Sequence, residues 1–199
     1  LKIFSDFQVL SPKLFSIITE KSYDFFRLEP KKVLYLSKIF FMIQRLIENN
    51  IKNDFNKGKI IVVLGARQVG KTTLFNSIID DQGSVLKLNC DDYDDRLDLE
   101  NKTSTELKNL IANHKVVIID EAQRVENIGL TLKIIADLKL DAQVLVTGSS
   151  SLELSSKINE PVTGRIFEYK LFPLSLSEMA RHTSEREENR LLEQRMIYG

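Results

Sequence analysis

The feature that most constrains this chain is an eight-residue segment, residues 65–72, which reads GARQVGKT and matches the pattern G-x-x-x-x-G-K-[ST] at every fixed position. The two glycines allow a tight turn whose backbone N–H groups converge on one anion. The lysine adds a mobile positive charge, and the hydroxyl that follows it can ligate Mg²⁺. The pattern therefore predicts a phosphate-binding loop, provided that a strand precedes it and a helix follows it.

Both flanking segments meet this condition. Residues 60–64, IIVVL, form the continuous β-branched run of a strand that is covered on both faces. Residues 71–80 are predicted to form a helix, whose N-terminus directs its positive dipole end at the same anion. We expect Lys71 to reach the β- and γ-phosphates and Thr72 to ligate Mg²⁺. The predicted nucleotide-binding residues are Gly65, Ala66, Arg67, Gln68, Val69, Gly70, Lys71, Thr72 and Thr73.

A second motif lies at residues 116–121, VVIIDE, where four apolar residues precede two acids. Mg²⁺ prefers oxygen ligands and keeps several waters, so Asp120 at the carboxyl end of a strand is predicted to hold it with Thr72. Glu121 is placed to act as general base towards an attacking water. Together the two motifs predict Mg²⁺-dependent hydrolysis of a nucleoside triphosphate. The guanine-specific motif Asn-Lys-x-Asp does not occur in the sequence, which favours ATP.

The alternation of strands and helices predicts an α/β fold, with a mostly parallel sheet flanked by helices. Further strands are expected at 85–88, 116–119, 143–147 and 166–170. Further helices are expected at 32–49, 103–112, 130–138, 151–157 and 184–197, with another starting within 173–180. Polar residues at 49–50 and 53–58 predict a break after the first helix, and residues 91–100 predict an acidic loop.

The pair Asp120-Glu121 resembles the additional-strand, catalytic-glutamate division of P-loop NTPases. In that division an extra strand separates the P-loop strand from the strand with the acids, and residues 143–147 are the candidate. Residues 147–150, TGSS, follow it. Ser149 is the preferred sensor of the γ-phosphate or the lytic water, with Thr147 second. An equally good alternative is that these serines cap the next helix.

The order of the motifs resembles a family of prokaryotic AAA-type ATPases, in which a C-terminal domain of poorly defined, nuclease-like fold follows the ATPase domain. The resemblance covers residues 32–199 and is carried by GARQVGKTT (65–73), IDEAQR (119–124), TGSSSLEL (147–154), Gly164-Arg165 and FPLSLSEM (172–179). It implies an N-terminal extension at 1–31, an ATPase domain at 32–180, and the start of a C-terminal helical region at 181–199. Since the chain starts at Leu1 and stops at Gly199, we expect a fragment of a longer protein.

The resemblance also makes Arg165 a candidate sensor or arginine finger, acting in cis or from a neighbouring subunit. The alternatives are a pair with a surface acid or a residue that merely opens a strand. Arg67 and Arg124 are interpreted as structural or solvated. No chemistry is assigned to the two histidines or to Cys90, which is interpreted as a small buried residue.

Composition limits the partners. Lys plus Arg number 28 and Asp plus Glu number 28, so the zero net charge does not favour nucleic acid as a broad electrostatic partner. A single cysteine favours a reducing, cytoplasmic setting, and no apolar run is long enough to span a membrane. The expected partners are ATP and a protein partner or second copy of the chain. Alternatives to a hydrolase are a nucleotide-dependent switch with little hydrolysis and a nucleic-acid motor.

Overall fold

The computed structural model describes residues 43–79, 83–149 and 162–198. The chain divides into two compact units, Leu1–Ile43 and Gln44–Gly199. The first unit lies almost wholly outside the described residues, and so does the predicted helix at 151–157. The description that follows therefore concerns the second unit.

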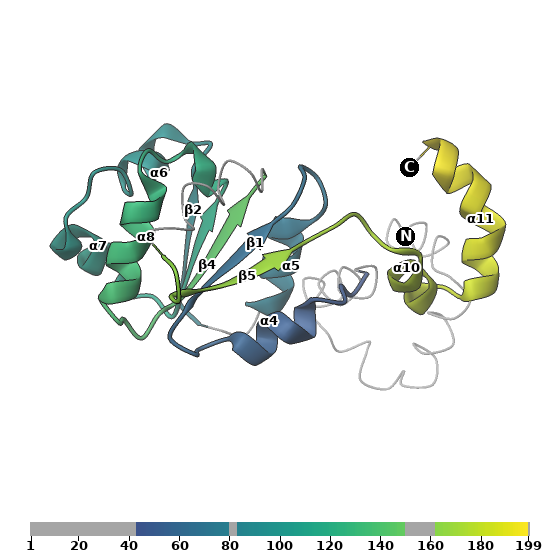
Figure 1. The fold of residues 1–199 in the computed structure, drawn as a ribbon, viewed down its shortest axis with the longest axis horizontal. Coiled ribbons are helices and arrows are strands. Elements are labelled where there is room, and N and C mark those ends of the chain that lie inside the picture. The colour runs from purple at the N-terminus through teal and green to yellow at the C-terminus, as the bar shows by residue number, and fades with distance from the viewer. Residues whose placement is uncertain (1–42, 80–82, 150–161, 199) are drawn as a thin grey trace, which may run out of the picture. The chain divides into compact units, whose positions relative to one another are not determined.

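A single parallel sheet of five strands forms the centre of this unit (Figure 1). The strands are β1 (Ile60–Leu64), β2 (Val85–Asn89), β3 (Val116–Asp120), β4 (Gln143–Gly148) and β5 (Ile166–Lys170), in the order β2-β3-β4-β1-β5. β4 is paired on one side with β1 and on the other with β3. This confirms both the parallel α/β fold and the extra strand predicted at 143–147.

Strand residues alternate between two apolar clusters, one on each face of the sheet. Ile60, Val62 and Leu64 of β1 belong to the cluster that includes residues of α7 (Ser104–Ile111) and α8 (Ile128–Asp137). Ile61 and Val63 belong to the cluster that includes residues of α4 (Glu48–Asp54) and α5 (Lys71–Ile78). Figure 1 shows these two helix pairs on opposite sides of the sheet. The continuous apolar run of β1 is thus explained by burial on both faces.

The remaining helices of the described residues are α6 (Tyr93–Leu97), the 3₁₀ turn η2 (Ala122–Arg124), α10 (Leu176–His182) and α11 (Glu185–Tyr198). α10 begins three residues after Pro173 because Ser175 is its N-cap, forming a capping box with Glu178.

The predicted helix over 32–49 is wrong at residues 43–47, which are not helical, and right only at residues 48–49, where α4 (Glu48–Asp54) begins. The helix therefore occupies the segment in which asparagines predicted a break. The physical reason is tertiary: Ile51 is fully buried in the cluster of α5 and the sheet, and Ile47 packs against the same cluster. That burial overrides the weak helix propensity of asparagine.

The predicted acidic loop at 91–100 contains the short helix α6, so that expectation needs correction. Asp92 is the N-cap of α6, and its side chain accepts a hydrogen bond from the backbone N–H of Asp94. Aspartate is unfavourable inside helices but favourable at their first turn, so an acidic run can begin a helix.

Candidate nucleotide-binding site

The predicted phosphate loop joins β1 to α5, at the carboxyl end of β1. Its two glycines are required for different reasons. A Cβ on Gly65 would lie 2.3 Å from the carbonyl oxygen of Leu171, so no side chain fits there. Gly70 is the N-cap of α5 and has φ of +93°, a left-handed conformation that favours glycine. The loop and the helix start thus have the geometry that the motif predicts.

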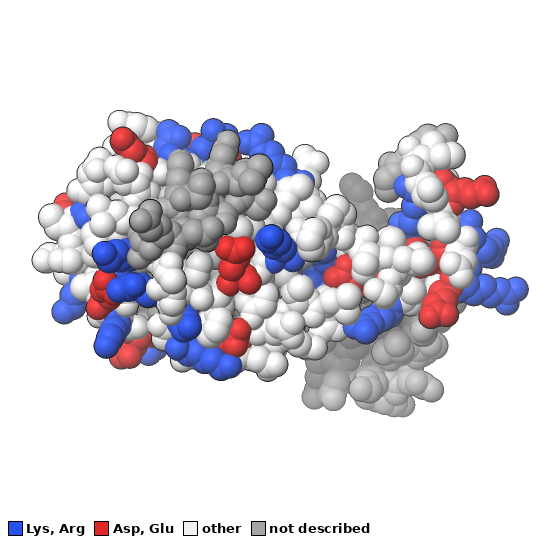
Figure 2. All heavy atoms as spheres, viewed as in Figure 1, with Lys and Arg blue, Asp and Glu red and all other residues white. Residues whose placement is uncertain are grey.

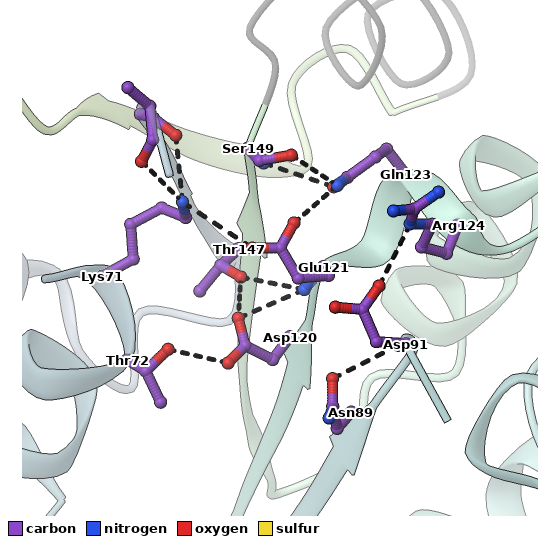
Figure 3. Close-up of polar contacts among 12 residues, drawn as sticks. Lys71, Thr72, Asn89, Asp91, Asp120, Glu121, Gln123, Arg124, Thr147 and Ser149 are labelled. Atoms are coloured by element: carbon purple, nitrogen blue, oxygen red, sulfur yellow. Dashed lines mark hydrogen bonds and ion pairs between the residues drawn. The ribbon is translucent and has the colours of Figure 1, made fainter. Parts of the chain in front are cut away.

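Lys71 is the buried cation of the site, with only 5% of its surface exposed. Its Nζ donates hydrogen bonds of 3.0 Å to the carbonyl oxygens of Gly65 and Ala66. The same nitrogen lies 3.9 Å from Oε1 of Glu121 (Figure 3). The charge of Lys71 is therefore held over the loop, beside Glu121, the acid that follows β3.

The two residues predicted to hold Mg²⁺ are in direct contact. The hydroxyl of Thr72 donates a 2.8 Å hydrogen bond to Oδ2 of Asp120. The other carboxylate oxygen, Oδ1, accepts a hydrogen bond from the hydroxyl of Thr147, which is fully buried. Hydroxyl and carboxylate oxygens are hard donors of the kind that Mg²⁺ prefers, so this pair fits the ion.

Glu121 follows β3 in a left-handed conformation, with φ of 52° and ψ of 42°. Non-glycine residues rarely adopt this conformation, and those that do are frequently found at functional sites. Its backbone N–H donates to Oγ1 of Thr147 at 3.0 Å, which helps to hold the turn. The side chain of Glu121 consequently lies in the pocket that is also lined by Gln68, Gly70, Lys71, Thr72 and Thr73.

Gln123, in η2, is a site residue that the sequence analysis did not identify. Its Nε2 donates a 2.6 Å hydrogen bond to Oε2 of Glu121 and a 2.7 Å hydrogen bond to Oγ of Ser149 (Figure 3). The backbone N–H of Ser149 donates to Oε1 of Gln123 at 3.3 Å. The amide therefore connects the candidate base with the candidate sensor. The sequence signal that could have identified Gln123 is its position, because it is a polar residue only two positions after Glu121.

The two sensor candidates thus contact different groups. The hydroxyl of Thr147 contacts the carboxylate of Asp120 and the backbone N–H of Glu121, whereas Ser149 is linked to the carboxylate of Glu121 through Gln123. The alternative role of the serines, as caps of a helix at 151–157, falls on residues outside the described part of the chain.

Arg165 and the phosphate loop lie at opposite ends of the strands of the sheet. β5 is parallel to β1, with Ile166 opposite Ile60. Arg165 therefore lies at the amino ends of these two strands, whereas the phosphate loop follows the carboxyl end of β1. A five-residue strand spans about 16 Å. Arg165 instead forms a 2.7 Å ion pair with Asp137 of α8. The structure does not bring it to the loop of its own chain.

The side chains of Arg124, Arg67 and Cys90 form no hydrogen bond or ion pair with Lys71 or with the carboxylates of the site, among the contacts of the described residues. Arg124 forms a 3.1 Å ion pair with Asp91, and Arg67 is exposed. Cys90 is fully buried, and burial, followed by the charges of Asp95 and Asp120, raises its pKa to about 12. Within the described ranges, no group of three or more His, Cys, Asp or Glu side chains is arranged to hold a metal ion.

Comparison with known proteins agrees with this geometry. A family model described as an AAA domain matches residues 57–180, which is more than half of the chain. The chain belongs to this AAA domain family. The match begins just before β1 and ends within α10, so it includes every strand and both motifs of the site. No curated protein resembles the chain closely enough to count as a match.

One solved structure with a TM-score above 0.5 shares the fold of this AAA domain. A Walker-type ATPase of Pyrococcus abyssi is 14% identical, with a TM-score of 0.52, over 75% of this chain and 59% of that one. A Drosophila ORC bound to DNA is also 14% identical, with a TM-score of 0.44, over 67% of this chain and 93% of that one. The chain therefore covers about three-fifths of the Pyrococcus abyssi protein, and that likeness concerns the fold. Of the helices in the described residues, none is long and apolar enough to cross a membrane.

Proposed function

We propose that this AAA domain binds ATP with Mg²⁺ and hydrolyses it. The observation that carries the proposal is the position of Glu121, whose carboxylate lines the same pocket as Lys71 and lies 3.9 Å from its Nζ. A domain that only binds nucleotide has no need for a carboxylate at this place. A carboxylate beside the phosphate loop is suited to take a proton from an attacking water.

The phosphates would be bound by the loop amides and by Lys71. The Nζ of Lys71, which now donates to two loop carbonyls, would exchange these partners for oxygens of the β- and γ-phosphates. Thr72 and Asp120 would hold Mg²⁺ through their adjacent oxygens. When bound, Mg²⁺ supplies positive charge beside the phosphate oxygens.

Glu121 would accept the proton of the attacking water at its carboxylate. Gln123 donates to Oε2, so that this oxygen is oriented and Oε1 is the atom nearer Lys71. Proton transfer to a group oriented in this way contributes roughly 10²–10⁴-fold to rate. Ser149 would sense the γ-phosphate through its link to Gln123, and Thr147 would keep both acids in place. A role for Arg165 remains a proposal only for a neighbouring subunit, since the arginine lies away from its own loop.

The partners that we propose are ATP and a protein, either a second copy of the chain or another protein, in the reducing setting of the cytoplasm. Nucleic acid is not favoured, because the positive and negative charges of the sequence are equal in number. Among the residues drawn in colour in Figure 2, blue and red side chains are interspersed on the face shown. This pattern gives little of the single-sign field that phosphate backbones require.

The test is phosphate release from ATP with and without Mg²⁺, for the wild type and for Lys71→Ala and Glu121→Gln. We expect turnover by the wild type that requires Mg²⁺, and a loss of at least about 100-fold in both variants. Glu121→Gln should still bind ATP, because the substitution leaves the loop intact. Binding without turnover by the wild type would contradict hydrolysis and favour a nucleotide-dependent switch. No binding at all would contradict the proposal as a whole.

A further inference from the structure

Arg45 is a buried arginine that connects three segments far apart in the sequence. It lies three residues before α4, and only 9% of its surface is exposed. Its Nη1 donates a 2.7 Å hydrogen bond to the carbonyl oxygen of Val69, in the phosphate loop. Its Nη2 donates to the carbonyl oxygen of Phe172, and its Nε forms a 3.0 Å ion pair with Glu178 of α10. The planar guanidinium, with donors in three directions, suits such a junction.

Both carboxylate oxygens of Glu178 accept hydrogen bonds. Its Oε1 accepts hydrogen bonds from Nε of Arg45 and from the backbone N–H of Leu46. Its Oε2 accepts from the backbone N–H and the hydroxyl of Ser175, which closes the capping box of α10. Although burial raises the pKa of Glu178, the hydrogen bonds from the backbones of Ser175 and Leu46, and then Arg45, lower it to about 2. The same carboxylate thus starts α10 and neutralises Arg45.

The segment that follows β5 is linked to both ends of the phosphate loop, directly at Gly65 and through Arg45 at Val69. Leu171 donates a 2.7 Å hydrogen bond to the carbonyl oxygen of Leu64, and its own carbonyl lies where a side chain on Gly65 would be. Phe172, the next residue, accepts from Arg45, which also holds Val69 at the other end of the loop. A Cβ on Gly70 would be 3.7 Å from Nη1 of Arg45.

The hydrogen bond to Val69 has a direct consequence for phosphate binding. The peptide between Val69 and Gly70 is planar and trans, so its C=O and N–H groups point in opposite directions. Because Arg45 holds the C=O group, it also fixes the direction of the N–H group of Gly70. That N–H belongs to the loop whose backbone donors surround the phosphates in this motif.

We propose that Arg45 is a positioning residue that orients the N–H of Gly70 for phosphate and couples the nucleotide state of the loop to α10. The proposal rests on the binding of nucleotide at the phosphate loop, as proposed above. A ligand that favours the ordered loop favours the Arg45–Glu178 pair, and the pair favours ligand by the same factor. Residues Pro173 to Glu178 of the FPLSLSEM segment thereby acquire a role, since they supply the acid that holds Arg45.

The first test is the affinity for Mg²⁺-ATP of Arg45→Met and Glu178→Gln, measured by calorimetric titration. Arg45→Met removes the donors and keeps most of the apolar volume, and we expect it to weaken binding about tenfold. Glu178→Gln keeps the side-chain shape and removes the charge, so it should weaken binding in the same direction. Arg45→Lys should not restore affinity, because one ammonium group does not present the guanidinium's fixed fork of donors.

Arg195→Met is the matched control. Arg195 is half-buried, forms a 2.7 Å ion pair with Glu188 in α11, and has no contact with the phosphate loop. It should cost comparable stability and leave nucleotide affinity unchanged. A wild-type affinity in folded Arg45→Met, or an equal loss in Arg195→Met, would overturn the positioning role.

The second test is hydrogen exchange, and its first comparison needs no nucleotide. Arg45→Met without ligand should exchange faster than wild type in peptides covering residues 65–73 and 176–182. Unchanged exchange in the loop would overturn the proposal even if the wild type bound no ATP, whereas absent binding with faster loop exchange would contradict only the proposed function. In the wild type, Mg²⁺-ATP should slow exchange in α10, and no change there would contradict the coupling.

Discussion

At Gly65, the side chain is excluded by space, while at Gly70 it is disfavoured by the backbone angle. The first glycine faces the carbonyl of Leu171 and the second has φ of +93°. A substitution at Gly65 must therefore displace the segment after β5, including Phe172, which is bonded to Arg45. A substitution at Gly65 would therefore disturb the phosphate loop at Gly65 itself and, through Phe172 and Arg45, at Val69.

We predict that Gly65→Ala lowers the free energy of unfolding by about 1–3 kcal/mol, the usual cost of forcing extra volume into a packed site. Urea unfolding followed by circular dichroism measures this change. The variant should also bind Mg²⁺-ATP more weakly. An unchanged unfolding midpoint would show that the segment after β5 moves aside at no cost.

Among the elements, the sheet has the strongest sequence signal and the short helices have the weakest. β1 and β4 are buried at every residue. β1 is also apolar at every residue, so it is identified without periodicity, whereas the apolar centre of β4 is the short run VLV. α7 is identified by its ends as well, because Thr103 and Glu106 form a complete capping box. α4 and α6 begin in polar segments that predict loops, and only packing or a local cap explains them.

We predict that Thr103→Ala destabilises the domain by about 1 kcal/mol, because the N-terminal N–H groups of α7 lose their side-chain acceptor. The neighbouring Ser104→Ala is the control, since Ser104 is exposed and lies inside the helix rather than at its cap. Chemical denaturation of the two variants gives the comparison. Equal losses in both would contradict a specific role of the cap.

At the scale of the molecule, the phosphate loop is supported from outside the motif itself. The segment after β5 lies against Gly65, while Arg45 holds Val69 and the acid of α10. The loop's conformation therefore depends on residues that precede and follow the motif by tens of positions. Arg45 and Glu178 form a buried ion pair. Removing either side chain would leave the charge of the other without its partner, which is costly in a protein interior.

The ion pair of Arg45 with Glu178 predicts that the free energy of unfolding depends on pH. The pKa of Glu178 in the fold is about 2, below its ordinary value of 4.5, so the carboxylate stabilises the fold above pH 4.5. That stabilisation is lost as pH falls from 4.5 towards 2. Urea unfolding midpoints should therefore fall more steeply with acid in the wild type than in Glu178→Gln. Parallel pH profiles would contradict the contribution of this group.

The sequence by itself determined the AAA fold and the core of the candidate site. The phosphate loop and the pair Asp120-Glu121 are local motifs, and the carboxyl ends of parallel strands lie on the same side of the sheet, which favours the observed contact of Thr72 with Asp120. The place of the extra strand, at 143–147, was implied by the resemblance that Asp120-Glu121 carries, and the strand order confirms it. These conclusions depend on short-range patterns, which a single sequence contains in full.

Only the tertiary structure decided the partners of the long polar side chains. Arg165 pairs with Asp137 rather than lying at its own loop, Gln123 joins Glu121 to Ser149, and Arg45 reaches Val69. A flexible side chain can bind any acid or carbonyl within its reach, and the neighbours within reach are set by the packing of distant segments. The residue types alone therefore left each of these contacts open.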